Sequence, residues 1–411
     1  MMRYVIVGAG PAGSSAVAQL ARLGVDGDEI VVLESAAGLP PSKVLWPEYA
    51  AGEVEDAVVP LSAPFDLVPD LRLPSRQLAG TGEVLRRGPL PEVRTGESVT
   101  SFSPATHRIC LAGGEQVGYG RLLLATGQPA GRPNLPGLCG SGVHYLNSQA
   151  AAATLREWIA GESCLGRVAV VGAGPAGIRL AQALAARGLP VTLCELQPIV
   201  LPGVVDPALA AEVRALLEAA GIVVGTNLRA LEIVRDHKGL PASLLCASTQ
   251  GGGGTAIPCR TVVFCTGAAR GLRGRAADTA PETVAGAPVD LGALETISVD
   301  AGMRTEWPDV FAAGDIALPP GWDAPPGLWR VATWQGRQAA LAMAGYGGGP
   351  PPQTVALTVR LGASVLVATR PYDGCGDSTG GSGAWHAVLR PAAGLDRNGV
   401  GLSFGGEVRA H

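Results

Sequence analysis

Three closely spaced glycines and a later acid mark a candidate phosphate-binding turn near the start of the chain. Gly8, Gly10 and Gly13 follow the apolar run Tyr4 to Val7, and Glu34 ends a second apolar run roughly 20 residues further on. In such a turn the glycines allow a tight bend, a close approach of backbone to a pyrophosphate, and close packing of helix on strand. The helix that follows directs its N-terminal N–H groups at the phosphates, while the acid accepts ribose hydroxyls. The spacing therefore predicts a strand, turn, helix and strand that bind a dinucleotide.

The same arrangement returns in the middle of the chain. Gly172, Gly174 and Gly177 repeat the hexapeptide Gly-Ala-Gly-Pro-Ala-Gly, after the apolar run Arg167 to Val171 and before an acid, Glu195. Repetition of the motif together with its flanking runs predicts two nucleotide-binding units in one chain.

Cysteine and histidine offer little further chemistry. The eight cysteines include no CxxC pair, so most are expected to be small core residues, and no metal site is predicted. His144 and His386 are candidate acids, but neither has a partner motif, and a structural role is the other interpretation of each.

Several other elements must position the two turns. Residues 37 to 94 are rich in proline and predict loops with short helices laid over the first unit. Val99 to Cys110 and Gln116 to Tyr119 predict strands of an antiparallel crossover, and Gly251 to Gly254 predict a hairpin tip. Two buried strands end on Thr-Gly, at Thr126-Gly127 and Thr266-Gly267. Each delivers a backbone turn near a cofactor, or else the threonine is only a strand cap.

The last third of the chain carries a second informative stretch. Thr305-Glu-Trp-Pro-Asp-Val-Phe-Ala-Ala-Gly314-Asp315 precedes a predicted helix, Trp329 to Gly345, and a β-rich region, Thr354 to His411.

With two fingerprints, two Thr-Gly strand ends and this Gly-Asp stretch, the chain resembles the two-dinucleotide-fold FAD/NAD(P) oxidoreductases over residues 3 to 345. It looks most like the ferredoxin and rubredoxin reductase branch, which has no redox-active disulfide. The resemblance implies an α/β fold with a discontinuous FAD-binding domain (1–125 and 268–346), an NAD(P)H-binding domain (146–267) and a small β-rich C-terminal domain (353–411).

The resemblance also assigns site residues. It implies that Asp315 bonds the ribityl chain and that the start of the helix Trp329 to Gly345 points at the flavin, where a helix N-terminus stabilises negative charge. The predicted FAD contacts are Gly8, Gly10, Pro11, Ala12, Gly13, Glu34, Lys43, Ala125, Thr126, Gly127, Gly314, Asp315 and Trp334. The predicted NAD contacts are Gly172, Gly174, Pro175, Ala176, Gly177, Glu195, Thr266 and Gly267.

Two basic residues are the candidate catalytic groups. Pro41-Ser42-Lys43 resembles the end of a ferredoxin reductase motif whose lysine lies beside flavin N5, although a solvated loop lysine is the other interpretation. Arg179 stands where relatives commonly have a glutamate that pairs with that lysine. Two buried cations repel, so either one points elsewhere or an anion lies between them.

The preferred nicotinamide follows from the second acid. Glu195 favours a free 2'-hydroxyl, and Leu196-Gln197-Pro198 supplies no arginine for a 2'-phosphate, so NADH is expected over NADPH. Arg187 has no evident partner at this site, and Arg229 is the remaining cation that could reach it.

The sequence predicts an enzyme in which NADH reduces FAD and the electrons pass to a ferredoxin-like protein. No cysteine lies between Glu34 and Glu53, which argues against disulfide, peroxidase or oxidase chemistry. One alternative is direct action on a small metabolite, with Trp46, Glu48 and Tyr49 lining a pocket and Lys43 or Arg179 receiving a carboxylate. Another is a slow redox-sensing protein that binds FAD and NADH.

Composition excludes other classes of partner. The formal net charge is −4 with no long basic run, which argues against nucleic acid. No secretory signal or membrane-spanning apolar run is recognised, so a cytoplasmic monomer or homodimer is expected.

Overall fold

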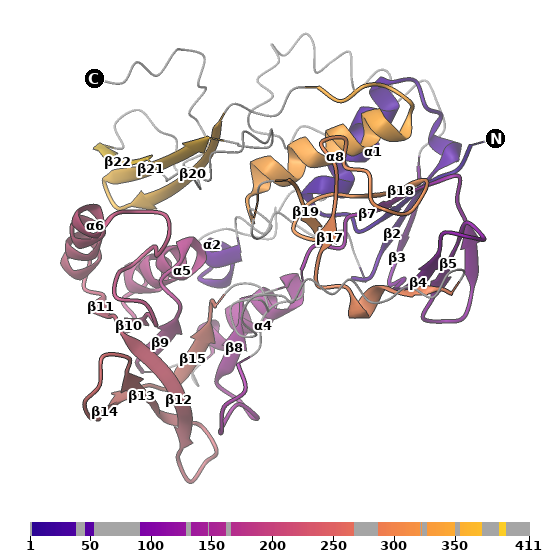
Figure 1. The fold of residues 1–411 in the computed structure, drawn as a ribbon. Helices are drawn as coiled ribbons and strands as arrows, with labels where there is room; N and C mark the ends of the chain where they lie inside the picture. The colour runs from indigo at the N-terminus through magenta and orange to yellow at the C-terminus, as the bar shows by residue number, and fades with distance from the viewer. Residues whose placement is uncertain are drawn as a thin grey trace.

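The computed structural model places two α/β units side by side, with a small antiparallel sheet over helices of the second unit (Figure 1). The structure describes residues 2–37, 46–52, 91–128, 133–146, 148–161, 166–266, 287–320, 322, 327–349, 354–371 and 386–391.

A five-stranded parallel sheet forms the core of the first unit. Its strands lie in the order β18-β7-β1-β2-β3. Their bounds are β1 Tyr4–Val7, β2 Ile30–Glu34, β3 Glu92–Thr95, β7 Arg121–Leu124 and β18 Val310–Ala312. Because β18 follows the second unit in sequence, the first unit is discontinuous, as the resemblance implied. The prediction of loops up to residue 94 was wrong at its end, where the exposed strand β3 adds an edge to the sheet.

Two helices and a second sheet complete the first unit. α1 (Pro11–Arg22) packs against α8 (Trp329–Met343), which confirms the predicted C-terminal helix to within two residues. The predicted crossover is antiparallel, in the order β16-β4-β5-β6. Its strands are β4 Val99–Ser103, β5 Arg108–Leu111, β6 Gln116–Gly118 and β16 Val289–Asp290.

The second unit repeats the first in its sheet order. Its parallel strands lie in the order β11-β10-β9-β15-β8. Their bounds are β8 Val143–Tyr145, β9 Val168–Val171, β10 Val191–Cys194, β11 Val223–Gly225 and β15 Thr261–Phe264. The helices are α4 Gln149–Ala160, α5 Pro175–Ala186 and α6 Pro207–Ala219. Ser148 and Asp206 cap α4 and α6 by accepting hydrogen bonds from the N–H groups of Ala151 and Leu209.

The strands at corresponding edges of the two sheets, β18 and β8, come from different places in the chain relative to their nucleotide turns. β8 precedes the second nucleotide turn, whereas β18 comes long after the first. Phe311 lies opposite Leu123, and His144 lies opposite Val263. Since Leu123 and Val263 each pair with the central strand at the same position, Phe311 and His144 occupy equivalent places in the two sheets.

Three further strands extend the second unit. β12 (Leu228–Arg235), β13 (Pro241–Ser248) and β14 (Gly254–Pro258) form an antiparallel sheet. The predicted glycine hairpin joins β13 to β14, but β12 and β13 were not predicted: most residues of β12 are exposed or half-buried, and the buried residues of β13 do not alternate regularly.

The C-terminal region is β-rich over its described residues, as predicted, and its strands are antiparallel. β20 (Thr354–Leu361), β21 (Ser364–Pro371) and β22 (His386–Pro391) form one sheet against α5 and α6. The short elements elsewhere are η1 Gly27–Glu29, α2 Trp46–Ala50, η4 Leu291–Ala293, β17 Ile297–Ser298 and β19 Ala317–Leu318.

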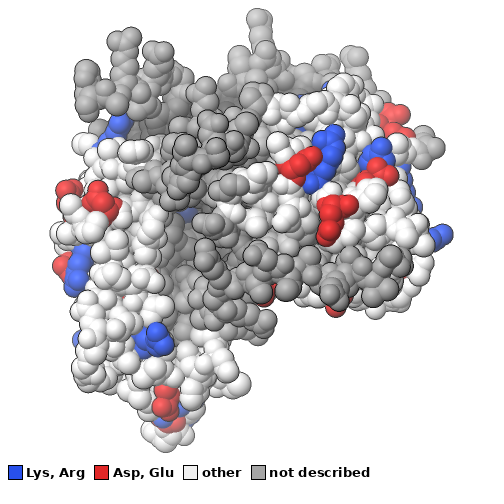
Figure 2. Space-filling view, in the orientation of Figure 1, with Lys and Arg blue, Asp and Glu red and all other residues white. Residues whose placement is uncertain are grey.

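Charged side chains are sparse and of mixed sign on the described surface of the face in Figure 2. Among the helices that the structure describes, none is long and apolar enough to cross a bilayer.

Candidate functional site

The first glycine turn requires glycine at two of its three positions. Gly8 has a φ of +101°, and a Cβ there would lie 2.4 Å from the carbonyl oxygen of Ala125; a Cβ on Gly13 would lie 2.0 Å from that of Gly8. Gly10 is the N-cap of α1, supplies no side-chain cap, and faces open space. The first-turn N–H groups of α1 are therefore left to an anion, as a pyrophosphate site requires.

Glu34 is tied to this turn by two backbone groups. The side chain is 8% exposed; Oε2 accepts a hydrogen bond from Ala9 N at 2.8 Å and Oε1 from Ala36 N at 2.9 Å. These bonds hold the carboxylate at the end of β2 in one orientation and leave lone pairs on both oxygens for ribose hydroxyls.

The second turn reproduces this geometry. Gly172 has a φ of +108°, and a Cβ on Gly177 would lie 1.8 Å from the carbonyl oxygen of Gly172. Glu195 is 7% exposed and accepts hydrogen bonds from Ala173 N at 2.7 Å and Gln197 N at 2.9 Å. Both predicted acids therefore serve the same structural role, each at its own turn.

The strand ends reach the turns as predicted, although the threonine side chains point outward. Ala125 is buried against Gly8, while Thr126 is exposed; Cys265 and the exposed Thr266 stand in the same relation to Gly172. Gly127 follows at the end of β7, whereas Gly267 lies outside the described residues. At the helix starts, Pro11 and Pro175 occupy the first turn, Ala12 is buried and Ala176 is exposed.

The Gly-Asp stretch closes over the first turn only. Gly314 has a φ of +81°, and a Cβ there would lie 3.1 Å from Cβ of Ala12. α8 crosses at the same place, since a Cβ on Gly336 would lie 2.0 Å from the carbonyl oxygen of Ala12. Asp315 and Trp334 are half-buried beside these contacts. Segments distant in sequence thus meet at the N-terminus of α1.

Two buried polar groups on α8 were missed from the sequence. Gln335 is 0% exposed; its Oε1 accepts a hydrogen bond from Gly314 N at 2.8 Å, while its Nε2 has no partner among the described residues. Thr333 is 5% exposed, and its Oγ1 likewise lacks one there. A buried donor without a partner costs about 1–3 kcal/mol, so these atoms fit a ligand that supplies acceptors beside the turn. Only the buried Gln-Gly pair within an alanine-rich helix hinted at this.

The segment that follows the first acid lies against the second unit. Ala50 and Ala51, at the end of α2, are 0% exposed within the core of that unit. Arg187, for which the sequence indicated no partner, donates from Nη1 to the carbonyl oxygen of Ala51. Arg179 is half-buried on α5, whereas Lys43 lies outside the described residues, so their predicted proximity stays a prediction.

Burial controls the titrating groups of the second unit. It lowers the pKa of His144 to about 4 and raises that of the Cys265 thiol to about 12. His144 Nε2 finds no partner in the described part of the chain, and its ring lies 5.4 Å from that of Trp158. Both groups are neutral at pH 7, and Cys265 is accordingly not a nucleophile there.

Both turns lie in a segment that matches a known protein family. The profile of the pyridine nucleotide-disulphide oxidoreductases matches residues 2–336, which is most of the chain. The chain belongs to that family. Membership agrees with the paired turns, and the donor and acceptor groups around the first turn fit FAD.

Relatives of this oxidoreductase place it in one branch of the family. A probable ferredoxin reductase, CtmF, of Castellaniella defragrans is 28% identical over 77% of this chain and 68% of its own. A rubredoxin-NAD(+) reductase of Pseudomonas putida is 27% identical over 77% of this chain and 72% of its own. The predicted resemblance to the ferredoxin and rubredoxin reductase branch is confirmed.

Solved structures agree on the fold. The ferredoxin reductase for the CYP199A2 system of Rhodopseudomonas palustris superposes with a TM-score of 0.70 at 23% identity, covering 92% of this oxidoreductase and 84% of that chain. The covalent putidaredoxin reductase–putidaredoxin complex gives 0.69 at 22%, covering 92% and 83%. The predicted α/β fold, with two Rossmann-like domains and a small C-terminal β sheet, is thereby confirmed, while its domain boundaries stay a prediction.

Proposed function

We propose that this oxidoreductase uses NADH to reduce FAD and delivers the electrons to a ferredoxin-like protein. The observation that carries the proposal is the asymmetry of two otherwise equal turns: the first is covered by Gly314 and α8, and among the described residues no helix covers the second in the same way. A covered turn suits a cofactor that stays bound. An uncovered one suits a dinucleotide that exchanges at every turnover.

The first turn supplies the contacts that FAD needs. The N-terminus of α1 receives the pyrophosphate, Glu34 accepts from the adenosine ribose, and Gln335 and Thr333 provide polar atoms from α8. Asp315 takes the ribityl chain, as the family resemblance implies. When bound, FAD would supply the redox chemistry between the nicotinamide and the acceptor, and the chain would position it and exclude water.

The second turn suits NADH rather than NADPH. Glu195 is held by two N–H groups facing a free 2'-hydroxyl, and a 2'-phosphate there would meet a buried carboxylate. Leu196, the residue after Glu195, is 43% exposed. Arg229 is also exposed, and it forms no ion pair with any described residue. Initial rates with the two nucleotides test this, and equal kcat/KM values would contradict it.

The acceptor is proposed from the relatives. The curated relatives include ferredoxin and rubredoxin reductases, and one structural neighbour was solved in complex with putidaredoxin. A small-molecule substrate is supported less, because Tyr49, predicted to line its pocket, lies half-buried under the guanidinium of Arg156. A cytoplasmic location and a monomeric or dimeric state complete the proposal.

One experiment separates these functions. Under anaerobic conditions NADH should bleach the visible flavin band within seconds, and cytochrome c should then be reduced rapidly only when a ferredoxin is added. Turnover with a small acceptor alone would favour the metabolite enzyme. Failure of both NADH and NADPH to bleach the flavin would contradict both enzymatic hypotheses, the ferredoxin reductase and the metabolite enzyme.

A further inference from the structure

Helix α2 belongs to the first unit by chain order but lies in the second by packing. Its neighbours are α4 and α5, and Ala50 and Ala51 are enclosed in the core formed by those helices. Figure 1 shows α2, coloured as part of the N-terminal segment, beside α5 of the second unit. The chain therefore crosses between the units three times before the second nucleotide turn begins: into α2, back to β3, and on to β8.

Arg187 holds the C-terminal end of α2. The carbonyl groups in the last turn of a helix lack intrahelical donors, and Nη1 of Arg187 donates to that of Ala51. Gly52 makes this approach possible: its φ is +77°, and a Cβ there would lie 2.7 Å from Nη1 of Arg187. A guanidinium at a helix C-terminus also interacts favourably with the helix dipole.

A second cation contacts another residue of α2. The guanidinium carbon of Arg156, on α4, lies 4.8 Å from the ring centroid of Tyr49, within the range of a cation–π contact. Tyr49 and Arg156 are both half-buried. Two arginines of the second unit thus contact one short helix, α2, that follows the first unit in the chain.

α2 is connected along the chain to the first nucleotide turn. The chain leaves the first unit beside Glu34, whose Oε1 is bonded to Ala36 N, and reaches the second unit at Trp46. Both ends of this short connection are therefore fixed, one at the first turn and the other by α2. α2 thus joins the packing of the second unit to a segment that begins at the first nucleotide turn.

We propose that Arg187 and Arg156 form an inter-unit clasp on α2 that positions the second unit for hydride transfer; this rests on the proposed function. Both are positioning residues, because neither lies at a nucleotide turn. Transfer between two bound dinucleotides depends steeply on their separation, and a misplacement of about 1 Å costs up to about 100-fold in rate. The clasp should therefore act on the rate of flavin reduction and leave each nucleotide's own contacts intact.

Arg187→Ala tests the clasp by anaerobic stopped-flow reduction of the FAD-loaded protein at saturating NADH. We expect the limiting rate to fall about 10-fold or more, with FAD content and the NADH concentration at half-saturation within about 2-fold of the wild type. Arg187→Lys, which keeps one donor, should recover part of the rate. Gly52→Ala, which displaces the guanidinium, should reproduce the loss.

Arg214→Ala is the matched control, because Arg214 also lies on a helix of the second unit and donates to a carbonyl, that of Val224, but within the same unit. It should leave the limiting rate unchanged. An unchanged rate in Arg187→Ala and Gly52→Ala, or an equal loss in Arg214→Ala, would overturn the proposal.

Hydrogen–deuterium exchange gives a readout that does not depend on turnover. Arg187→Ala should raise exchange in residues 46–52 and leave that of α6 unchanged; unaltered exchange there would contradict the clasp. If NADH fails to bleach the wild-type flavin, the proposed function fails by itself, and the exchange result still decides whether the clasp exists.

Discussion

The two nucleotide turns of this oxidoreductase are nearly identical in their local structure and different in their surroundings. Each has a glycine at positive φ beside the next strand's end, a glycine packed on a carbonyl, and a glutamate bonded to two N–H groups. Only the first lies under Gly314 and α8, where Gly336 touches Ala12. Local sequence therefore forms each turn, whereas a helix distant in sequence covers only the first of the two.

The sharpest test of this comparison substitutes the packed glycine of each turn. Gly13→Ala and Gly177→Ala both force a Cβ against a carbonyl oxygen, so each turn should lose its nucleotide. We expect the first variant to purify without flavin. The second should keep its visible absorbance but no longer be bleached by NADH. Absorbance ratios and far-ultraviolet circular dichroism check this; a colourless Gly177→Ala protein with native dichroism would break the assignment of the two turns.

The edge strands β8 and β18 predict how the free energy of unfolding depends on pH. His144 stands where the first sheet has Phe311, and burial lowers its pKa from 6.5 to about 4. Between these values the unfolded chain binds the proton more readily, so stability is full above pH 6.5 and falls by up to about 3 kcal/mol toward pH 4. His144→Phe should remove most of this loss. Urea unfolding at pH 7 and pH 4 measures it, with the exposed His237→Phe as control; an unchanged pH dependence in His144→Phe would contradict it.

Glu34 and Glu195 should each affect the binding of one nucleotide only. Loss of hydrogen bonds to a charged group costs about 1.5–3 kcal/mol, which is about 10- to 100-fold in affinity. Glu195→Ala should raise the KM for NADH by that factor and leave FAD affinity unchanged, whereas Glu34→Ala should weaken FAD. Flavin fluorescence on titration of the apoprotein measures the latter. A shared effect of both variants on FAD would show that the turns are not independent.

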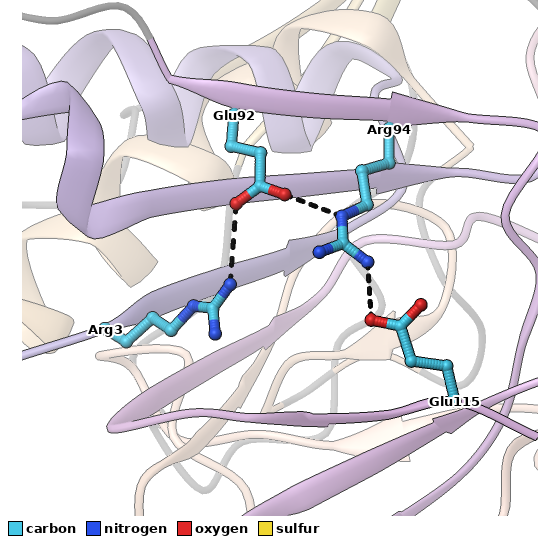
Figure 3. Close-up of polar contacts among 4 residues, drawn as sticks. All are labelled: Arg3, Glu92, Arg94 and Glu115. Atoms are coloured by element: carbon cyan, nitrogen blue, oxygen red, sulfur yellow. Dashed lines mark hydrogen bonds and ion pairs between the residues drawn. The ribbon is translucent and has the colours of Figure 1, made fainter.

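The sheet edges give the smallest expected effect. On β3, Arg94 bridges Glu92 at 2.7 Å and Glu115 at 2.8 Å, and Arg3 joins Glu92 at 3.4 Å (Figure 3). The matching edge of the second unit, β11, exposes Val223 at 56%, as β3 exposes Val93 at 45%. These exposed ion pairs contribute little, so Arg94→Ala should cost less than about 1 kcal/mol, and less still in 1 M salt. A loss above 2 kcal/mol in urea unfolding would mean that the edges differ in more than surface charge.

Much of the fold follows from local patterns. Tyr4–Val7 and Val168–Val171 are short buried runs, and a glycine turn directly after such a run has few alternative structures. β3 and β12 were missed for the opposite reason: all their residues except Ile233 are exposed or half-buried, so the hydrophobic periodicity is weak and pairing with a neighbouring strand determines the structure. Gln335 was missed because the sequence of a helix does not show which polar residue will be buried against a distant segment.

By itself the sequence determined that the chain has two nucleotide turns, the acid that belongs to each, and the family, because these depend on contacts within about 30 residues. The tertiary structure decided that α8 covers one turn, that Gln335 bonds Gly314, and that Arg187 holds α2 against the second unit. Such contacts join segments far apart in the chain. Their geometry depends on how whole units pack, which no local pattern of residues specifies.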